Sequence, residues 1–313
     1  GDKPKTLVGL DGTVEEFDSL VKDIWGSGRK NVTTGVSIGK VLANTGVAPD
    51  VTFSDAKANI KFVHRRLNDG EIYWIANQTK QARKFTASFN VTGKKPQLWH
   101  ADTGAKEDVS YEMVDGRTRV TLDMPAYDAV FVVFVDDTDV PAVTLAERTR
   151  TAFAEFVQPW TVSFQAHRGA PSQIALDSLA SLTESSEQGV KYFSGVATYT
   201  NNFKVAKKSL KKNASSRILL DLGEVKDLAE VTVNGLPVGV VWHAPYIIDI
   251  TAAVKVGDNK VDIAVVNPWH NRMVGDMQPG AETVTYYPIK YYKADEPLLK
   301  SGLIGPARIV GER

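Results

Sequence analysis

The sequence predicts a mostly β protein with three parts: a small N-terminal α/β segment, an antiparallel β-sandwich and a β jelly roll. Three observations support this fold class. Apolar residues change from helical spacing to alternation near residue 58, short alternating stretches recur over the rest of the chain, and Asp-Gly or Asn-Gly pairs separate several of them. A chain of 313 residues is long enough for two or three domains. We expect their boundaries at 1–57, 58–137 and 138–313.

The N-terminal segment has the pattern of two helices. Thr13 and Glu16 form a capping-box signature ahead of a helical run of apolar residues. A second helix is expected from Ser37 to Gly46, because glycine favours the position just after a helix end. A short strand is expected between them, over residues 31–34. This piece is too short to fold alone, and we interpret it as the tail of a larger α/β domain.

Residues 58–137 have the period of a half-buried β-sheet. A hairpin is predicted where Asn68-Asp69-Gly70 separates two strand patterns, and a second one at Asp115-Gly116. Residues 130–135 are continuously apolar, which predicts a strand buried on both faces. An antiparallel sandwich accounts for these features.

The charged, proline-terminated stretch 136–141 marks the boundary to the third part. Beyond it, seven short strand patterns favour a jelly roll. They lie at residues 160–164, 191–203, 217–222, 230–233, 238–242, 247–250 and 260–266. Asn234-Gly235 predicts a type I′ turn, in which both residues have positive φ.

The composition bounds the function. Lys and Arg together number 37, as do Asp and Glu, so charge gives no reason to expect nucleic acid or an anionic membrane as a partner. The one basic cluster, residues 207–212, is interpreted as a solvated loop. The absence of cysteine excludes disulfides, a thiol nucleophile and a zinc–thiolate site. No apolar run approaches the roughly 18 residues of a membrane span, and no signal sequence is recognised.

Three blocks of motifs, in this order, resemble the C-terminal region of glycoside hydrolase family 106, whose characterised members are α-L-rhamnosidases. The first block is GVAPD at 46–50, FVHRR at 62–66 and IYWIAN at 72–77, and the second is GKKPQLW at 93–99 with TG at 103–104. The third is KYFSG at 191–195, DLG at 221–223, VNG at 233–235, NPWHNR at 267–272 and SGLIGP at 301–306. Residues 231–276 also resemble the galactose-binding-like, sugar-binding jelly roll of family 2 glycoside hydrolases.

The family 106 resemblance implies a large multidomain hydrolase with a catalytic (β/α)₈ barrel N-terminal to these motifs. No barrel fits ahead of residue 58, since a barrel needs at least about 200 residues. The family's catalytic glutamates have no matching positions, so no catalytic residue is assigned. The resemblance further implies a periplasmic or secreted protein. Its expected partners are the barrel of the parent polypeptide and a plant or microbial polysaccharide, with rhamnose-containing ones as one option.

The residues themselves give little support for a catalytic site or a metal site. Glu71, Asp221 and Glu282 are available carboxylates, but glycoside hydrolysis needs two that face one sugar, and none follows a barrel strand. The five histidines show no metal-binding spacing. A structural Ca²⁺ is common in jelly rolls of the kind that this chain resembles, but its ligands would be largely backbone oxygens that the sequence does not locate.

A cluster of aromatic and polar residues is the candidate ligand-binding site. Its members are Trp242, His243, Tyr246, Trp269, Asn271, Arg272 and Asp276. Tryptophan can stack on the apolar face of a sugar while the polar groups bind hydroxyls. The alternative is structural: the tryptophans fill the rim of the sandwich and Arg272 pairs with Asp276. Because Asn267-Pro268 must end a strand, we expect the residues that follow in a loop, partly exposed and bonded mainly to water.

Three functional hypotheses remain open at this level. The leading one is an accessory portion of an α-L-rhamnosidase-like glycoside hydrolase that is non-catalytic alone. The second is an independent carbohydrate-binding module, and the third is a structural spacer without affinity for sugar.

Overall fold

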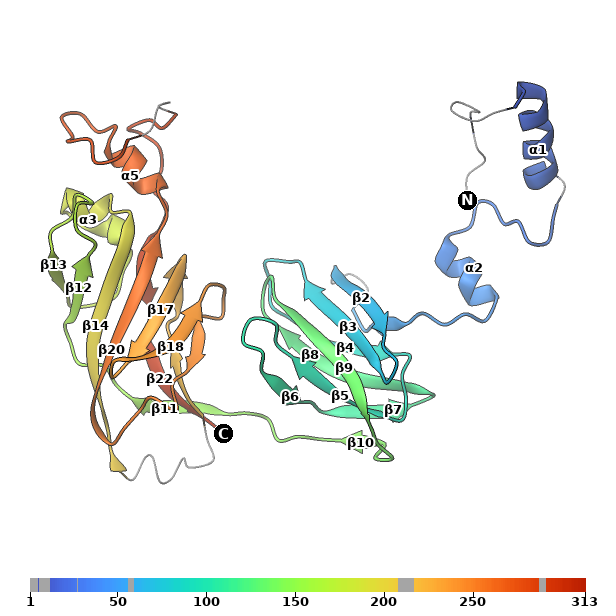
Figure 1. The fold of residues 1–313 in the computed structure, drawn as a ribbon, viewed down its shortest axis with the longest axis horizontal. Helices are drawn as coiled ribbons and strands as arrows, with labels where there is room; N and C mark the ends of the chain where they lie inside the picture. Colours follow the sequence, from blue (N-terminus) through green and yellow to red (C-terminus); the bar gives the residue numbers. More distant parts are fainter. Residues whose placement is uncertain (1–4, 6–11, 27, 56–58, 208–216, 287–290) are drawn as a thin grey trace. The chain divides into compact units, whose positions relative to one another are not determined.

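The computed structural model describes residues 5, 12–26, 28–55, 59–207, 217–286 and 291–313. The chain is mostly β, as the sequence predicts, and it divides into two compact units, Gly1–Leu145 and Ala146–Arg313 (Figure 1). The expected solvated loop at 207–212 lies almost wholly outside the described residues. None of the described helices combines the length and the apolar character that crossing a bilayer requires.

Helix α1 (Val14–Gly26) begins with the predicted capping box. The Oγ1 atom of Thr13 accepts a hydrogen bond from the backbone N–H of Glu16 at 3.2 Å, and the Thr13 N–H donates to Glu16 Oε2 at 2.9 Å. These two bonds satisfy N–H groups that have no partner within the first turn of a helix. Of the side chains of α1, only that of Val21 is buried.

Helix α2 (Ile38–Asn44) also matches its prediction, with Ser37 as N-cap and Gly46 at φ 80° just after its end. The strand expected over residues 31–34 is wrong. Val32 instead donates its N–H to Arg29 O at 3.0 Å in a turn. Residues 31–34 have no neighbouring strand to pair with among the described residues, so their backbone is irregular.

The first unit contains an antiparallel sandwich of two five-stranded sheets. One sheet has the order β1-β4-β8-β7-β10, formed by Val51–Phe53, Arg83–Phe89, Arg117–Met124, Tyr111–Val114 and Ala142–Val143. The other has the order β2-β3-β9-β5-β6, formed by Ile60–Arg66, Glu71–Asn77, Ala129–Asp137, Lys94–Trp99 and Lys106–Asp108. The core contains a cluster of edge-to-face rings, in which Tyr73, Phe89 and Phe134 lie 4.8–6.0 Å apart between centroids.

Both predicted hairpins of this sandwich form. Arg66 pairs with Glu71 across the first one, where a Cβ atom on Gly70 would lie 2.1 Å from Phe134 O. Asp115 and Gly116 have φ of 51° and 71°, as a type I′ turn requires. Strand β9 lies between β3 and β5, and four of the six residues of its apolar run 130–135 are buried, among them the neighbours Val132 and Val133, which point to opposite faces as predicted.

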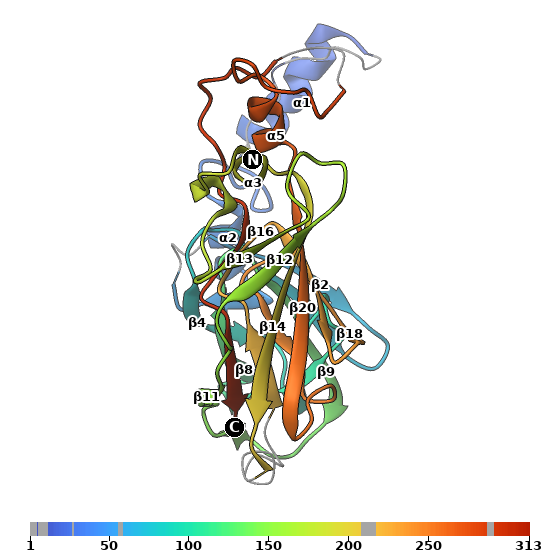
Figure 2. The ribbon, with the colours of Figure 1, turned by 90° about the vertical axis from the view of Figure 1, so that its left-hand side faces the viewer.

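The second unit is a jelly roll with an antiparallel six-stranded sheet packed against a four-stranded one (Figure 2). The six-stranded order is β13-β12-β14-β20-β17-β18, from Gln173–Leu176, Trp160–Phe164, Gly195–Val205, Gly257–Asn267, Leu228–Val233 and Leu236–Val241. The four-stranded order is β11-β22-β15-β19, from Arg150–Ala154, Arg308–Glu312, Arg217–Asp221 and Ile247–Asp249. A small pair adds β16 (Glu224–Lys226) and β21 (Gly302–Gly305).

Six of the seven strand patterns fall within one or two residues of a strand or inside a longer one. The exception is the pattern at 191–203, whose first residues follow a short helix, α3 (Gln188–Lys191), so that β14 begins only at Gly195. Strands β11, β13, β16, β21 and β22 have no counterpart among the predicted strands.

The Asn234-Gly235 hairpin forms as predicted between β17 and β18. The two residues have φ of 53° and 80°, and Val233 pairs with Leu236 across them. The amide of Asn234 donates to Ala253 O and to Asn259 Oδ1, both at 2.8 Å. The turn is therefore tied to the neighbouring loop as well as to its own strands.

Candidate functional site

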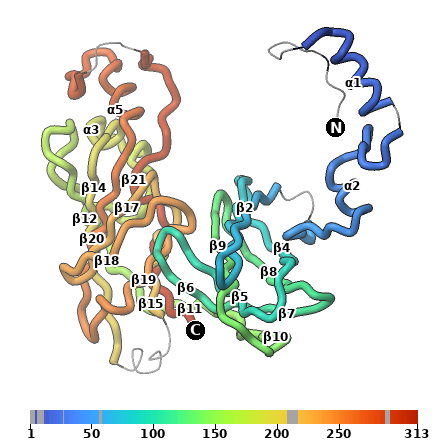
Figure 3. Tube along the Cα trace, turned by 45° about the vertical axis from the view of Figure 1, so that its right-hand side comes forward, coloured from blue at the N-terminus to red at the C-terminus, as the bar shows by residue number. Residues whose placement is uncertain are grey.

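All seven predicted site residues come after one of two strands, β18 and β20, which finish at the same end of the six-stranded sheet. Strand β18 ends at Val241 and β20 at Asn267, and β17 pairs with both there, through Ala229–Val241 and Leu228–Val266. Helix α5 (His270–Gly275) continues from β20, and α3 lies at this same end of the jelly roll (Figure 3).

Two tryptophans are exposed at this end. Trp242 has 62% of its surface exposed and Trp269 has 51%. The guanidinium carbon of Arg168 lies 5.1 Å from the centroid of Trp269, a cation–π distance, and His243 meets Trp242 edge-to-face at 4.7 Å. Large exposed aromatic faces with adjacent hydrogen-bonding groups match the mixed apolar and polar surface of a sugar.

His243 and Tyr246 hold the segment that follows β18. His243 Nδ1 lies 3.0 Å from Ala244 O, and Tyr246 O accepts from the N–H of Leu222 at 2.9 Å. Burial raises the pKa of the half-buried Tyr246 hydroxyl, and the negative charges of Asp227 and Glu224 raise it further. Tyr246 therefore stays protonated at neutral pH, with a phenolic O–H that can donate a hydrogen bond.

The expectation that Asn271 and Arg272 would be exposed and bonded to water is wrong. Asn271 has no exposed surface, and it exchanges two hydrogen bonds with the backbone of Leu299, at 2.6 and 2.9 Å. Arg272 is 6% exposed and donates from Nε to Asp276 Oδ1 at 2.9 Å. The physical reason is that a helix, rather than a loop, follows β20, and the chain after it returns over that helix.

Asp276 ties this returning chain in place. Its carboxylate accepts from Arg272 Nε, from the N–H groups of Val284 (3.1 Å) and Thr285 (2.9 Å), and from the Thr285 hydroxyl. Burial acts to raise the pKa of Asp276, but the hydrogen bonds from Thr285 and Val284 and the charge of Arg272 outweigh it and lower the pKa. Asp276 is therefore ionised and fully occupied, a structural role rather than an open ligand.

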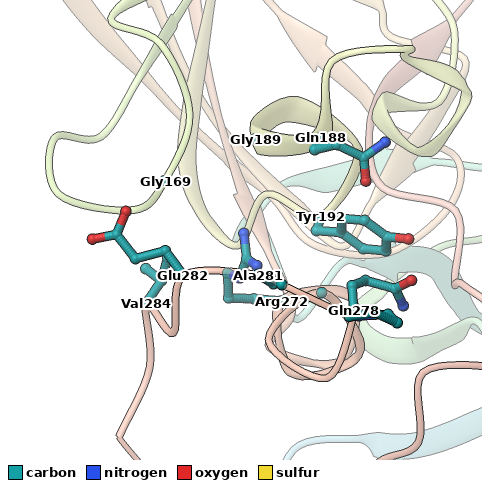
Figure 4. A pocket seen from close by; sticks show the side chains of 12 residues that line it. Gly169, Gln188, Gly189, Tyr192, Arg272, Gln278, Ala281, Glu282 and Val284 are labelled. Carbon is teal, nitrogen blue, oxygen red and sulfur yellow. The ribbon is translucent and has the colours of Figure 1, made fainter.

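A pocket of about 330 Å³ lies beside α5 (Figure 4). Arg272 and Tyr192 contribute to its wall, together with Gln188, Gln278 and Glu282. Arg272 is the only one of the seven predicted residues that lines this pocket.

The sequence interpretation missed Arg168 and Tyr192. Arg168 belongs to the connection between β12 and β13, and Tyr192 follows α3. Arg168 lies 101 residues before Trp269 in the chain, and Tyr192 lies 80 residues before Arg272. Only the pairing of β12, β14 and β20 brings these segments to one end of the sheet, and no local motif signals it.

The three available carboxylates lie in separate surroundings. Glu71 contacts His64 Nε2 at 2.8 Å in the first unit, Asp221 accepts from the N–H of Gly223 at 2.9 Å, and Glu282 is exposed at the pocket. Within the described ranges, no group of three or more His, Cys, Asp or Glu side chains could hold a metal ion. The expected backbone-liganded Ca²⁺ is not addressed by this finding and stays a prediction.

Comparisons with known proteins identify two segments of the chain. Residues 1–113 match the model of the family described as α-L-rhamnosidase, glycoside hydrolase family 106. Residues 173–294 match the galactose-binding domain-like model of glycosyl hydrolase family 2. A curated protein of Formosa agariphila, named "Putative beta-glucuronidase", is 36% identical over an alignment of 174 residues, and the match covers 48% of this chain and 15% of that protein.

A solved structure, that of a rhamnosidase from Novosphingobium sp. PP1Y, matches almost the whole chain. Its TM-score is 0.86 at 45% sequence identity, covering 96% of this chain. The chain spans only 29% of that rhamnosidase and 15% of the Formosa protein. Residues 1–113 are therefore similar to the α-L-rhamnosidases of glycoside hydrolase family 106, residues 173–294 to the galactose-binding-like domain of family 2, and the chain has the fold of the matching part of the Novosphingobium rhamnosidase.

Proposed function

We propose that this chain is a carbohydrate-binding accessory portion of an α-L-rhamnosidase-like glycoside hydrolase, non-catalytic alone. The observation that carries the proposal is the pair of exposed tryptophans, Trp242 and Trp269, at one end of a galactose-binding-like jelly roll. Exposed aromatic rings on a rigid sandwich lose little conformational entropy when they stack on a ligand. In this proposal the sugar contacts the rings of Trp269 and Trp242 and the hydroxyl of Tyr246. Asn271 and Asp276 do not contact it; they hold α5 and the chain that follows it in place through hydrogen bonds.

The expected partner within the parent polypeptide is a catalytic barrel. Most of the Novosphingobium rhamnosidase lies outside the match, which leaves room for a barrel of about 250 residues. The ligand we propose is a plant or microbial polysaccharide of the rhamnose-containing class. Since such polymers lie outside the cytoplasm, a periplasmic or secreted location follows, and fractionation of the native organism would test it.

Titration with a rhamnose-containing oligosaccharide tests the binding role. We expect Trp269→Ala and Trp242→Ala each to raise the dissociation constant roughly tenfold, because each removes a stacking face worth about 1.4 kcal/mol. Tyr127→Ala is the matched control, since Tyr127 is an aromatic residue of the first unit with 72% of its surface exposed. Unchanged affinity in both tryptophan variants would contradict the proposed surface, and an absence of any binding would favour the structural spacer.

Hydrolysis of an aryl α-L-rhamnoside tests the non-catalytic part of the proposal. The purified chain should show no turnover, because its candidate carboxylates do not share one site. Turnover that disappears on substitution of one Glu or Asp would establish a complete active site within this chain. Binding without turnover also fits an independent carbohydrate-binding module. A barrel encoded directly upstream in the same reading frame would rule out that alternative.

A further inference from the structure

Arg272 lines the pocket beside α5 with most of its hydrogen-bonding capacity unused. The residue is 94% buried, since 6% of it is exposed, and its Nε donates to Asp276. Its two terminal nitrogens, Nη1 and Nη2, have no hydrogen-bond partner among the described residues. Neither nitrogen is among the buried side-chain atoms that lack a partner, so both are open to the solvent of the pocket, where a charged acceptor from outside the chain can replace water.

Three glycines keep the space around this guanidinium open. A Cβ atom on Gly275 would lie 2.6 Å from Arg272 Nη2, and one on Gly169 would lie 3.3 Å from Nη1. Gly189 allows the backbone of α3 to approach Gly169, whose carbonyl oxygen would lie 2.1 Å from an added Cβ. All three glycines line the pocket. The cavity is thus walled by backbone and leads to the two free nitrogens.

The remaining polar groups of the pocket suit hydroxyls. Gln278 donates its Nε2 to Val274 O and Ala294 O, at 3.2 and 2.8 Å, which leaves its Oε1 as an acceptor. Gln188 is exposed at the rim, and Figure 4 shows the Glu282 carboxylate directed away from Arg272. A ligand that combines a carboxylate for the arginine fork with hydroxyls for the amides would satisfy both kinds of group.

We propose that this pocket binds the carboxylate of an acidic sugar, a hexuronate, through Nη1 and Nη2 of Arg272. The inference rests on the proposed function in one respect, namely that the ligand is carbohydrate. Asp276 does not compete for these nitrogens, because its oxygens are occupied by Arg272 Nε, Val284 and Thr285. The volume of about 330 Å³ is at the lower end of ligand pockets, which suits one sugar ring.

Calorimetric titration of the full chain with D-galacturonate, D-glucuronate, D-galactose and acetate tests this proposal. A hexuronate should bind at least about tenfold more tightly than galactose, since a charge-assisted fork contributes more than neutral hydrogen bonds. Acetate, which has the carboxylate without the ring, should bind more weakly than the hexuronates. Equal affinity for galactose would overturn the carboxylate contact, and equal affinity for acetate would overturn the sugar.

Charge variants at two exposed positions of the pocket, Ala281 and Glu282, are controls that spare the fold. Ala281 is exposed and lines the pocket, so Ala281→Glu should weaken hexuronate binding several-fold by repulsion, whereas the isosteric Ala281→Gln should not. Glu282→Gln should strengthen it. Arg272→Lys keeps the charge but not the fork and should weaken binding roughly tenfold.

Identical affinities in all four variants would overturn the site. Binding of a rhamnose-containing oligosaccharide that depends on Trp269 but is unaffected by these pocket variants would leave the proposed function intact while the acidic-sugar site fails. Conversely, hexuronate binding that responds to the pocket variants, together with oligosaccharide binding that does not depend on Trp269, would support the acidic-sugar site and contradict the proposed tryptophan surface.

Discussion

The first sandwich and the jelly roll are both antiparallel two-sheet folds, yet they treat charge differently. In the first sandwich, pairs such as Lys94–Asp137 and Arg119–Glu112 have at least one strongly exposed partner. In the jelly roll, Glu312 is 4% exposed and contacts three arginines. Buried charges need compensation that surface pairs do not. The jelly roll therefore buries a carboxylate that needs charged partners, whereas the buried polar side chains of the first sandwich, Asn77 and Thr118, are neutral and bond to backbone carbonyl oxygens.

The connections differ as well. Type I′ turns close Asp115-Gly116 in one unit and Asn234-Gly235 in the other. Within the part of the chain that the structure describes, the longest connection between two strands belongs to the jelly roll: it joins β20 to β21, and Asn271 and Asp276 hold its described parts in place. Long connections of this kind are uncommon in compact domains unless they serve a function. This connection supports the proposal that the sugar-contacting surface is at this end of the jelly roll.

The largest effects should come from the two separate cores. Phe134→Ala and Trp160→Ala remove side chains that are 0% and 2% exposed, and each should cost about 3–5 kcal/mol of unfolding free energy. Because the two residues belong to different clusters, each change should lower the melting temperature of its own unit only. Scanning calorimetry would show this as one shifted transition, and a shift of both by either variant would break the division into two units.

Glu312→Gln should have the next largest effect. It removes a buried carboxylate that accepts from Arg150 and Arg217, and hydrogen bonds to charged groups contribute about 2 kcal/mol. Glu112→Gln is the matched control in the first sandwich, where the side chain is 61% exposed, and should change stability by less than about 0.5 kcal/mol. Equal effects in denaturant titrations would contradict the contrast in charge burial.

Acid should act through the same carboxylate. Burial acts to raise the pKa of Glu312, but hydrogen bonds from Arg150 and Arg217 outweigh it, so its folded-state pKa lies below the ordinary value. Its contribution is therefore present above the unfolded-state pKa of glutamate and lost as pH falls through the folded-state pKa. Unfolding free energy measured against pH should fall less steeply on acidification in Glu312→Gln than in the natural chain. An unchanged pH profile would show that Glu312 is not the group that titrates.

The smallest loss of stability is expected for substitutions in the type I′ turn that occurs once in each unit. Gly235→Val and Gly116→Val each put a β-branched residue at positive φ, and each should cost roughly 1 kcal/mol or more. Leu236→Val is a control beside the first of these turns, at a side chain that is 52% exposed, and should be nearly neutral. If Gly235→Val leaves the melting temperature unchanged, the turn does not have the strain that its φ angles imply.

Local patterns were enough to predict most of the fold. The capping box of α1, the Asn-Gly and Asp-Gly turns and the alternating strands depend on residues close together in sequence. The strand at 31–34 failed because strand formation also needs a partner, which its own residues do not provide. Strand β21 was missed because half of its residues are glycine, and β22 was missed because its five residues do not alternate clearly between apolar and polar.

The candidate site was predictable in location but not in exposure. Strand β20 ends at Asn267, directly before the proline, and the residues that follow lie at this end of the sheet, as expected. It does not show that α5 forms, nor that the chain returns so that Leu299 covers Asn271. The contacts of Trp269 with Arg168 and of Arg272 with Tyr192 depend on strand pairing between residues that are 101 and 80 positions apart in the chain.

Hydrogen–deuterium exchange with and without a bound rhamnose-containing oligosaccharide tests the central claim most directly, because it reports on both units at once. The account predicts slower exchange of backbone amides at residues 242–247 and 269–277, with no change over residues 60–137. Protection confined to residues 60–137, at a concentration where binding is established independently, would contradict the assignment of sugar contact to the jelly roll.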